Sequence, residues 1–149
     1  MNITAITQLE EEHYQLLLDA DPSKKHVDDY TKRGQVFIIS DPKLVGIMVL
    51  IPTRPDTLEL VNIAVAEASR GKGYAQKLIA FAFDTAKKQG IKTMEIGTGS
   101  TGYEQLHLYQ KCGFRMTWID RDFFVRHYDE EIVDNGIVLN DMVRLSIDL

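Results

Sequence analysis

Apolar and polar positions follow two different periods along the chain, and together they predict a mixed α/β protein. Runs of β-branched and aliphatic residues are typical of strands, and apolar residues three and four positions apart are typical of helices. The strand pattern covers residues 2–6, 35–40, 45–51, 58–65, 91–96, 114–119 and 142–147. The helical pattern covers residues 8–20, 24–33, 73–89 and 103–111.

Local signals predict where some of these elements begin and end. Thr7, with Glu10 three residues later, has the spacing of a capping box and predicts that the first helix starts after Thr7. Gly34 is expected to end the second helix. The prolines within residues 52–56 predict a turn between two strands.

Residues 58–96 predict a strand–helix–strand unit. The helix at 73–89 carries an apolar stripe and is followed by Gly90, a typical helix stop. Two strands joined by one helix lie parallel, with a right-handed crossover. We therefore expect strands 58–65 and 91–96 to be parallel.

The turn before this helix, Arg70-Gly71-Lys72-Gly73, predicts a phosphate or pyrophosphate site. Glycines allow a tight bend and let a ligand approach the backbone closely. The first N–H groups of a helix lack partners inside it and attract anions. Arg70 and Lys72 add full positive charge.

Two better-known phosphate motifs fit this turn less well. A P-loop would continue with lysine and then serine or threonine, whereas Tyr74 follows Gly73. A dinucleotide-binding motif would need a third glycine where Gln76 stands. A helix start whose glycines serve packing alone is the remaining alternative.

Composition and charge limit the classes of partner. The 149 residues suffice for one domain and are too few for two ordinary ones. A net charge of −5 argues against a nucleic-acid surface. Cys112 is the only cysteine, which favours a reducing compartment and predicts a cytoplasmic protein. Residues 1–20 lack a signal-peptide pattern and no apolar run is long enough to span a bilayer, so no membrane association is expected.

A second motif, Leu108-Tyr109-Gln110-Lys111-Cys112-Gly113-Phe114, begins in the last predicted helix and ends just after it. Together with Arg70-x-x-Gly73-x-Ala75, it resembles the signatures of the GCN5-related N-acetyltransferase (GNAT) family. The resemblance is good over residues 35–119, looser before them, and rests on element order alone after residue 120. It implies one N-acetyltransferase domain over residues 1–149. The implied fold is α/β, with a mixed, mostly antiparallel sheet that is flanked by helices and splays open after its fourth strand to hold acetyl-CoA.

The resemblance also implies roles for individual residues. The residues matching the pyrophosphate loop are Arg70, Gly71, Lys72, Gly73, Tyr74 and Ala75. Ile63, Ala64 and Val65 match the strand that pairs with the pantetheine arm, where a backbone N–H would polarise the thioester carbonyl. Tyr109 matches the general acid, although a tyrosine in a partly buried helix also fits a packing role.

The chain departs from the family near Tyr109. Many relatives carry Asn and Ala where Gly102 and Gln105 stand, and that Asn contacts the pantetheine arm. Ser100 or Thr101 is the substitute expected here.

Acetyl transfer to an amine needs a neutral nucleophile, so a base or a desolvating pocket is required. Glu59, on the strand before the loop, is the candidate base, acting directly or through water. A surface carboxylate is the alternative for Glu59, and Glu95 and Glu104 are weaker candidates. The histidines show no ligand spacing, and no metal is predicted.

The predicted activity is acetyl-CoA-dependent acetylation of a primary amine by direct attack in a ternary complex. A non-catalytic acyl-CoA-binding or regulatory module is one alternative, and an enzyme with another acyl group or acceptor is a second. The acceptor is open between small molecules and peptides.

Residues 120–141 form a charged excursion in which Asn135-Gly136 predicts a hairpin. We expect it to supply specificity or homodimer contacts, with Asp129, Glu130 and Glu131 attracting a cationic acceptor. A solvated hairpin with buried aromatic residues is the alternative.

Overall fold

Seven strands form one mixed sheet in the order β1-β2-β3-β4-β5-β9-β6. The computed structural model describes residues 1–149. The strands of this sheet are β1 (Asn2–Ile6), β2 (Gln35–Ser40), β3 (Leu44–Arg54), β4 (Thr57–Val65), β5 (Thr93–Gly99), β6 (Arg115–Asp120) and β9 (Met142–Asp148). A separate two-stranded hairpin, β7 (Val133–Asp134) and β8 (Ile137–Val138), turns at Asn135-Gly136, as predicted.

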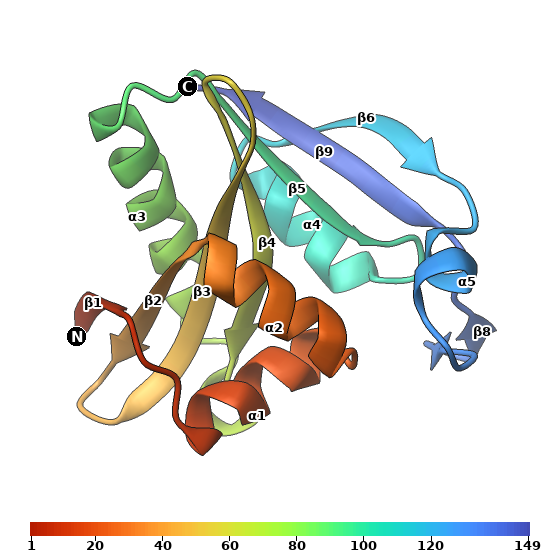
Figure 1. Ribbon diagram of the computed structural model, residues 1–149, viewed down its shortest axis with the longest axis horizontal. Helices are drawn as coiled ribbons and strands as arrows, with labels where there is room; N and C mark the ends of the chain where they lie inside the picture. Colours follow the sequence, from red (N-terminus) through yellow and green to blue (C-terminus); the bar gives the residue numbers. More distant parts are fainter.

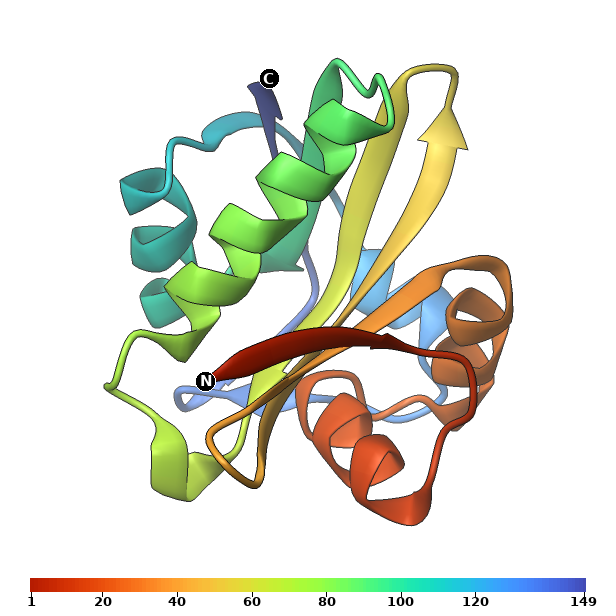
Figure 2. The ribbon, with the colours of Figure 1, turned by 90° about the vertical axis from the view of Figure 1, so that its left-hand side faces the viewer.

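Helices cover both faces of the sheet (Figures 1 and 2). The helices are α1 (Glu11–Ala20), α2 (Lys24–Arg33), α3 (Tyr74–Lys88), α4 (Tyr103–Lys111) and the short α5 (Phe123–His127), with a 3₁₀ turn η1 (Glu67–Ser69) before α3. Figure 2 shows α3 and α4 on one face, and α1 and α2 on the other. None of the helices is both long and apolar enough to cross a membrane.

Two apolar clusters hold these layers together. The larger contains 18 buried residues and includes the apolar stripe of α3, with Leu78 and Ile79 fully or almost fully buried. The smaller contains eight buried residues and joins Leu17 of α1 and Val27 of α2 to the opposite face. The sheet therefore has an apolar core on each side.

Strands β4 and β5 are parallel, as the strand–helix–strand pattern predicts, but they pair over only part of their length. Thr57 to Leu60 of β4 face Thr93 to Ile96 of β5, and the pairing ends there. The strands then diverge, and Figure 1 shows the opening between them. Because β9 lies between β5 and β6, it supports β5 from Thr93 to Gly99 on the side away from β4.

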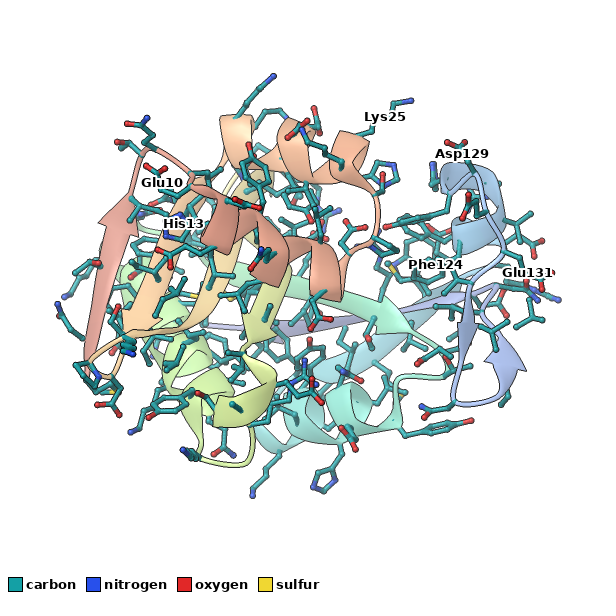
Figure 3. The ribbon with its side chains drawn as sticks, turned by 90° about the horizontal axis from the view of Figure 1, so that it is seen from below. Glu10, His13, Lys25, Phe124, Asp129 and Glu131 are labelled. Atoms are coloured by element: carbon teal, nitrogen blue, oxygen red, sulfur yellow. The ribbon has the colours of Figure 1, made fainter.

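Three predicted boundaries are wrong by three residues, while β5 begins at Thr93 rather than at residue 91. Helix α1 begins at Glu11 rather than after Thr7, because Glu10 and His13 form the capping box, with Glu10 N–H donating to His13 Nδ1 at 2.9 Å (Figure 3). Strand β3 continues through Pro52 to Arg54 because Pro52 lies beyond the last pairing of β3 with β2, where a missing N–H costs little. Strand β5 continues past Ile96 because β9 pairs with residues 97–99.

The packing of α3 makes a stability prediction. Leu78→Ala should reduce the free energy of unfolding by about 2–5 kcal/mol, because it leaves a cavity in the larger cluster. Urea denaturation measures this loss. Asp84→Ala, on the exposed side of the same helix, should change it by no more than about 0.5 kcal/mol. Equal losses for the two variants would contradict the packing of α3 described here.

Candidate active site

The opening between β4 and β5 forms a cleft of about 390 Å³. Residues 60–63 of β4 and residues 97–99 of β5 form its two strand walls. The end of α1 and the following loop (residues 19–22), α4 with Tyr109, and parts of the excursion from residue 124 onward complete it. Side chains and backbone from both faces of the sheet therefore meet in one cleft.

A β-bulge shapes the β4 wall. Val49 pairs with Asn62 whereas Leu50 pairs with Leu60, so Val61 is an extra residue in β4. A bulge bends its strand and redirects the residues around it. Beyond Val61, β4 keeps its pairing with β3 and has none with β5.

Backbone groups of this free edge are available to a ligand. In a strand, N–H and C=O groups alternate between the two sides, so some of those from residue 62 to residue 65 point away from β3 without a strand partner. The predicted residues Ile63, Ala64 and Val65 lie on this segment, and Ile63 lines the cleft itself.

The loop before α3 has the properties of an anion site. Gly71 and Gly73 have φ angles of 80° and 83°, in the region that favours glycine. A Cβ at Gly71 would meet nothing within 4 Å, so the loop surface is open. None of the N–H groups of residues 71–76 has an acceptor in the protein. Six consecutive free N–H groups at a helix start suit a pyrophosphate.

Side chains tie this loop to the body of the protein. Arg70 Nε donates to the Val65 carbonyl at 3.2 Å, and its Nη2 lies 2.8 Å from the Asp19 carboxylate. The Tyr74 hydroxyl donates to Asp41 at 2.5 Å. Lys72 is exposed, and Ala75 lies in the first turn of α3. The loop is held from both ends while its N–H groups stay free.

Tyr109 reaches the cleft from α4. Its side chain is only 5% exposed and packs edge-on against Phe114, yet it lines the cleft. No protein group accepts or donates a hydrogen bond at its hydroxyl. Burial raises the pKa of Tyr109, so the phenol stays protonated at neutral pH.

Glu59 lies in a second, smaller cavity of about 220 Å³. This cavity is lined by β4, β5 and β9, by α2, and by α5 with Tyr128. Arg144 Nη1 donates to Glu59 Oε2 at 3.1 Å. Burial raises the pKa of Glu59, and the Arg144 guanidinium opposes that rise.

Arg144 reaches Glu59 because β5 has no side chain between them. Arg144 on β9 pairs with Gly97 on β5, the strand that separates β9 from β4. A Cβ at Gly97 would lie 3.2 Å from Arg144 Nη1 and 2.7 Å from Met142 Sδ. Arg144 also lies over the Phe123 ring at 5.6 Å, so the excursion helps to hold it.

Tyr109 and Glu59 therefore lie in adjoining cavities rather than in a single one. Tyr109 lines the larger cleft and Glu59 the smaller cavity. The residues that line both are Asp21, Val61, Gly97, Tyr128 and Met142. A water-mediated path between Glu59 and a ligand near Tyr109 fits this arrangement better than direct contact.

Several other predicted candidates lie away from both cavities. Glu95 is engaged by Thr53 and Arg54. Ser100 and Glu104 line neither cavity, and the Thr101 hydroxyl donates to Asp134, whereas Gly102 and Gln105 line the larger cleft. The acidic residues of the excursion, Asp129, Glu130 and Glu131, are exposed and line neither cavity. Figure 3 places Asp129 and Glu131 on the outer side of the excursion and Phe124 toward the cleft.

The structure brings in residues that the sequence analysis did not select. Arg144 is the only lysine or arginine that lines either cavity, and Asp21 is the only charged residue that lines both. Neither stands in a recognisable motif. The Asp21-Pro22-Ser23 sequence indicates a break between helices, and nothing in it indicates a ligand site.

Comparison with known proteins identifies the family. The acetyltransferase (GNAT) family pattern matches residues 3–114. The chain belongs to the GNAT family of acetyltransferases. The predicted family and its splayed, mostly antiparallel fold are confirmed, and the chain is an N-acetyltransferase by class.

Several known proteins are similar to this GNAT chain over nearly its whole length. The uncharacterized N-acetyltransferase YvbK of Bacillus subtilis (strain 168) is 54% identical over 140 residues, 93% of this chain and 90% of YvbK. The structure of an IAA acetyltransferase from Bacillus cereus ATCC 14579 has a TM-score of 0.94 at 45% identity and covers 99% of both chains. An acetyltransferase from Bacillus subtilis in complex with CoA has a TM-score of 0.93 at 51% identity, over 99% of this chain and 97% of that one.

The Glu59–Arg144 contact predicts a change in a pKa. Arg144→Met should raise the pKa of Glu59 further, because burial then acts without the opposing guanidinium. A pH titration of the Glu59 carboxyl by ¹³C NMR measures this. As a control, Arg115→Met removes the same charge from an exposed position on β6 and should leave the pKa of Glu59 unchanged. A lower or unchanged pKa of Glu59 in Arg144→Met would show that Arg144 does not oppose the effect of burial.

Proposed function

We propose that this GNAT enzyme transfers an acetyl group from acetyl-CoA to a primary amine by direct attack within a ternary complex. The observation that carries this proposal is the cleft, where a free strand edge meets a buried tyrosine. The open anion site at the start of α3 is joined to this cleft through Arg70, which contacts Asp19 of the cleft wall. The relative whose structure holds CoA supports acetyl-CoA as the donor.

The donor would lie along the opening of the sheet. The free N–H groups at the start of α3 would bind its pyrophosphate, with the loop formed by Arg70, Gly71, Lys72, Gly73, Tyr74 and Ala75. Backbone groups of Ile63, Ala64 and Val65 would pair with its pantetheine arm, except for the Val65 carbonyl, which accepts from Arg70. A backbone N–H near the Val61 bulge would polarise the thioester carbonyl. Ser100 stays a predicted pantetheine contact, although it does not line the cleft.

Glu59 would remove the proton from the amine. Burial raises its pKa toward the range where a carboxylate is an effective base, while Arg144 limits the rise. Because Glu59 lies in the smaller cavity, the proton would pass through water to reach it. The neutral amine nitrogen can then attack the carbonyl carbon.

Tyr109 would give its proton to the sulfur as the carbon–sulfur bond breaks. A thiol that behaves like cysteine has a pKa of about 8.5 in water, below that of a phenol. Desolvation in the cleft raises the pKa of the thiol as well as that of Tyr109, so a free thiolate is disfavoured there and leaves more easily when the phenol donates to its sulfur. Tyr109 has no competing hydrogen-bond partner, so its proton is available to the leaving group.

Thiol release tests the activity directly. Purified protein, acetyl-CoA and a panel of amines should release CoA thiol with at least one acceptor. CoA binding without release for any amine would instead indicate a non-catalytic acyl-CoA-binding module.

The homodimer, the single-domain organisation and the cytoplasmic location stay predictions.

The loop before α3 predicts a specific loss of CoA affinity. Gly73→Glu should weaken CoA binding by about 10- to 100-fold, the size of one charge-assisted contact, because it strains a left-handed position and adds negative charge beside the pyrophosphate. Isothermal titration with CoA measures the affinity. Gly136→Glu makes the same change at another left-handed glycine (φ 74°), in the β7–β8 turn, and should bind CoA normally. If both variants bind CoA as the wild type does, the loop is not the pyrophosphate site.

Removal of the Tyr109 hydroxyl tests its catalytic role. Tyr109→Phe should lower turnover by about 10²–10⁴-fold, the usual contribution of one proton transfer, with nearly unchanged CoA affinity. Stopped-flow thiol release under conditions where chemistry limits the rate gives this number. Tyr103→Phe, at an exposed site on the same helix, serves as the control. Wild-type turnover of Tyr109→Phe at every pH would exclude Tyr109 as the acid.

A further inference from the structure

Asp21 stands at the junction of the two cavities. It lies in the loop between α1 and α2, and it is the only charged residue that lines both the larger cleft and the smaller cavity. A group bound at Asp21 would therefore lie beside the site of Tyr109 and beside that of Glu59.

Three donors from three segments fix the Asp21 carboxylate. The Tyr30 hydroxyl donates to Oδ2 at 2.9 Å, the Tyr128 hydroxyl to Oδ1 at 2.8 Å, and the Ser23 N–H to Oδ1 at 3.2 Å. Burial raises the pKa of both tyrosines, so both stay protonated and continue to donate. Two carboxylate oxygens can accept about four hydrogen bonds, so capacity remains for a ligand.

Asp21 differs from most carboxylates around it because it has no cationic partner. Asp19 pairs with Arg70, Asp29 with Arg33, and Glu59 with Arg144. Asp134 also lacks a cation, but it lines only the larger cleft. All the donors to Asp21 are neutral, so a half-buried negative charge remains uncompensated beside both cavities.

Asn62 provides a second, independent indication of a site for a hydrogen-bond donor. It is only 4% exposed and lines the larger cleft, and its Oδ1 is buried without a hydrogen-bond partner. Its Nδ2 donates to the Leu17 carbonyl at 3.0 Å and to the Tyr30 oxygen at 2.8 Å. The reverse orientation would place two carbonyl oxygens together, so the vacant acceptor is Oδ1. A buried acceptor of this kind is costly unless an N–H or O–H donor reaches it.

The chemistry of the reaction decides which nitrogen Asp21 would hold. A nearby carboxylate without a counter-ion raises the pKa of an amine and so disfavours the neutral form that must attack. The charge of Glu59 is balanced by Arg144, so Glu59 does not raise the pKa of the reacting nitrogen in this way. A fixed negative charge at Asp21 is therefore productive only when it holds a second nitrogen that remains protonated.

We propose that Asp21 and Asn62 Oδ1 bind a non-reacting ammonium group, so that the preferred acceptors are amines with at least two basic nitrogens. This inference rests on the proposed amine acetylation and adds the acceptor class. The second nitrogen donates to the Asp21 carboxylate and to Asn62 Oδ1, while the first lies toward Tyr109 and the Glu59 cavity. Tyr30 and Tyr128 position Asp21 for this contact.

Matched acceptors test the proposal. A series of linear diamines is compared with monoamines of equal chain length, and the ratio of their kcat/KM values is measured. The wild type should prefer one diamine length. Asp21→Asn should lower that ratio by about 10- to 100-fold, the effect of losing one charge-assisted hydrogen bond. Tyr128→Phe, which keeps the charge but removes one of its supports, should lower it by less.

Asp129→Asn is the control. It removes one carboxylate next to Tyr128, but from an exposed site that lines neither cavity, and it should retain the wild-type ratio. Calorimetric binding of the preferred diamine to the CoA complex gives a readout without turnover, and Asp21→Asn should weaken it by the same factor.

The outcomes separate this inference from the proposed function. The role of Asp21 would be overturned if monoamines and diamines had equal kcat/KM values, or if Asp21→Asn left the ratio of these values unchanged. Either result would still be consistent with amine acetylation. Absence of thiol release with every amine would overturn both. An equal fall in Asp129→Asn would show that general surface charge, rather than Asp21, selects the acceptor.

Discussion

The early end of the β4–β5 pairing is the constraint on which the rest of the site depends. The two strands share only four paired positions, and each then continues against its other neighbour, β4 against β3 and β5 against β9. The sheet can therefore open in the middle while both halves stay hydrogen-bonded. The bulge at Val61 adds to the divergence by bending β4 where the pairing ends. Tyr109 reaches this opening from one face and Asp21 from the other, while Glu59 lies in the adjoining cavity, on the part of β4 that still pairs with β5.

The charges around the opening are arranged so that two carboxylates have different properties. Arg144 crosses Gly97 to reach Glu59, and a side chain on β5 at that point would displace it. Glu59 is therefore a buried carboxylate with a counter-ion, suited to accept and release a proton. Asp21 is held by hydroxyl groups and a backbone N–H, which orient its charge without neutralising it. A carboxylate thus suits proton transfer at Glu59 and cation binding at Asp21, because its surroundings differ.

Much of the fold and part of the site could be predicted from short-range patterns. The helix at Tyr103–Lys111 was predicted with the bounds it has, and the parallel pair follows from the strand–helix–strand order. One error arose where a distant segment decides a boundary, since β9 extends β5 beyond Ile96. The error at α1 was local, because Glu10 with His13, rather than Thr7 with Glu10, forms the capping box. The acidic residues of the excursion show the same limit, because sequence position alone could not tell that Asp129 and Glu131 face outward while Tyr128 faces Asp21.

The sequence by itself determined the glycine loop before α3, the motif that contains Tyr109, and the family to which both point. Each of these depends on residues that are close together in the chain. The helix start and its free N–H groups are local consequences of Gly71 and Gly73. The Glu59–Arg144 contact joins residues 85 positions apart, and the Tyr128–Asp21 hydrogen bond joins residues 107 positions apart. Such contacts depend on strand order and register, because a side chain meets whatever the neighbouring strand presents. Only the folded sheet, with β9 inserted beside β5, places these partners together and gives the cleft its charge.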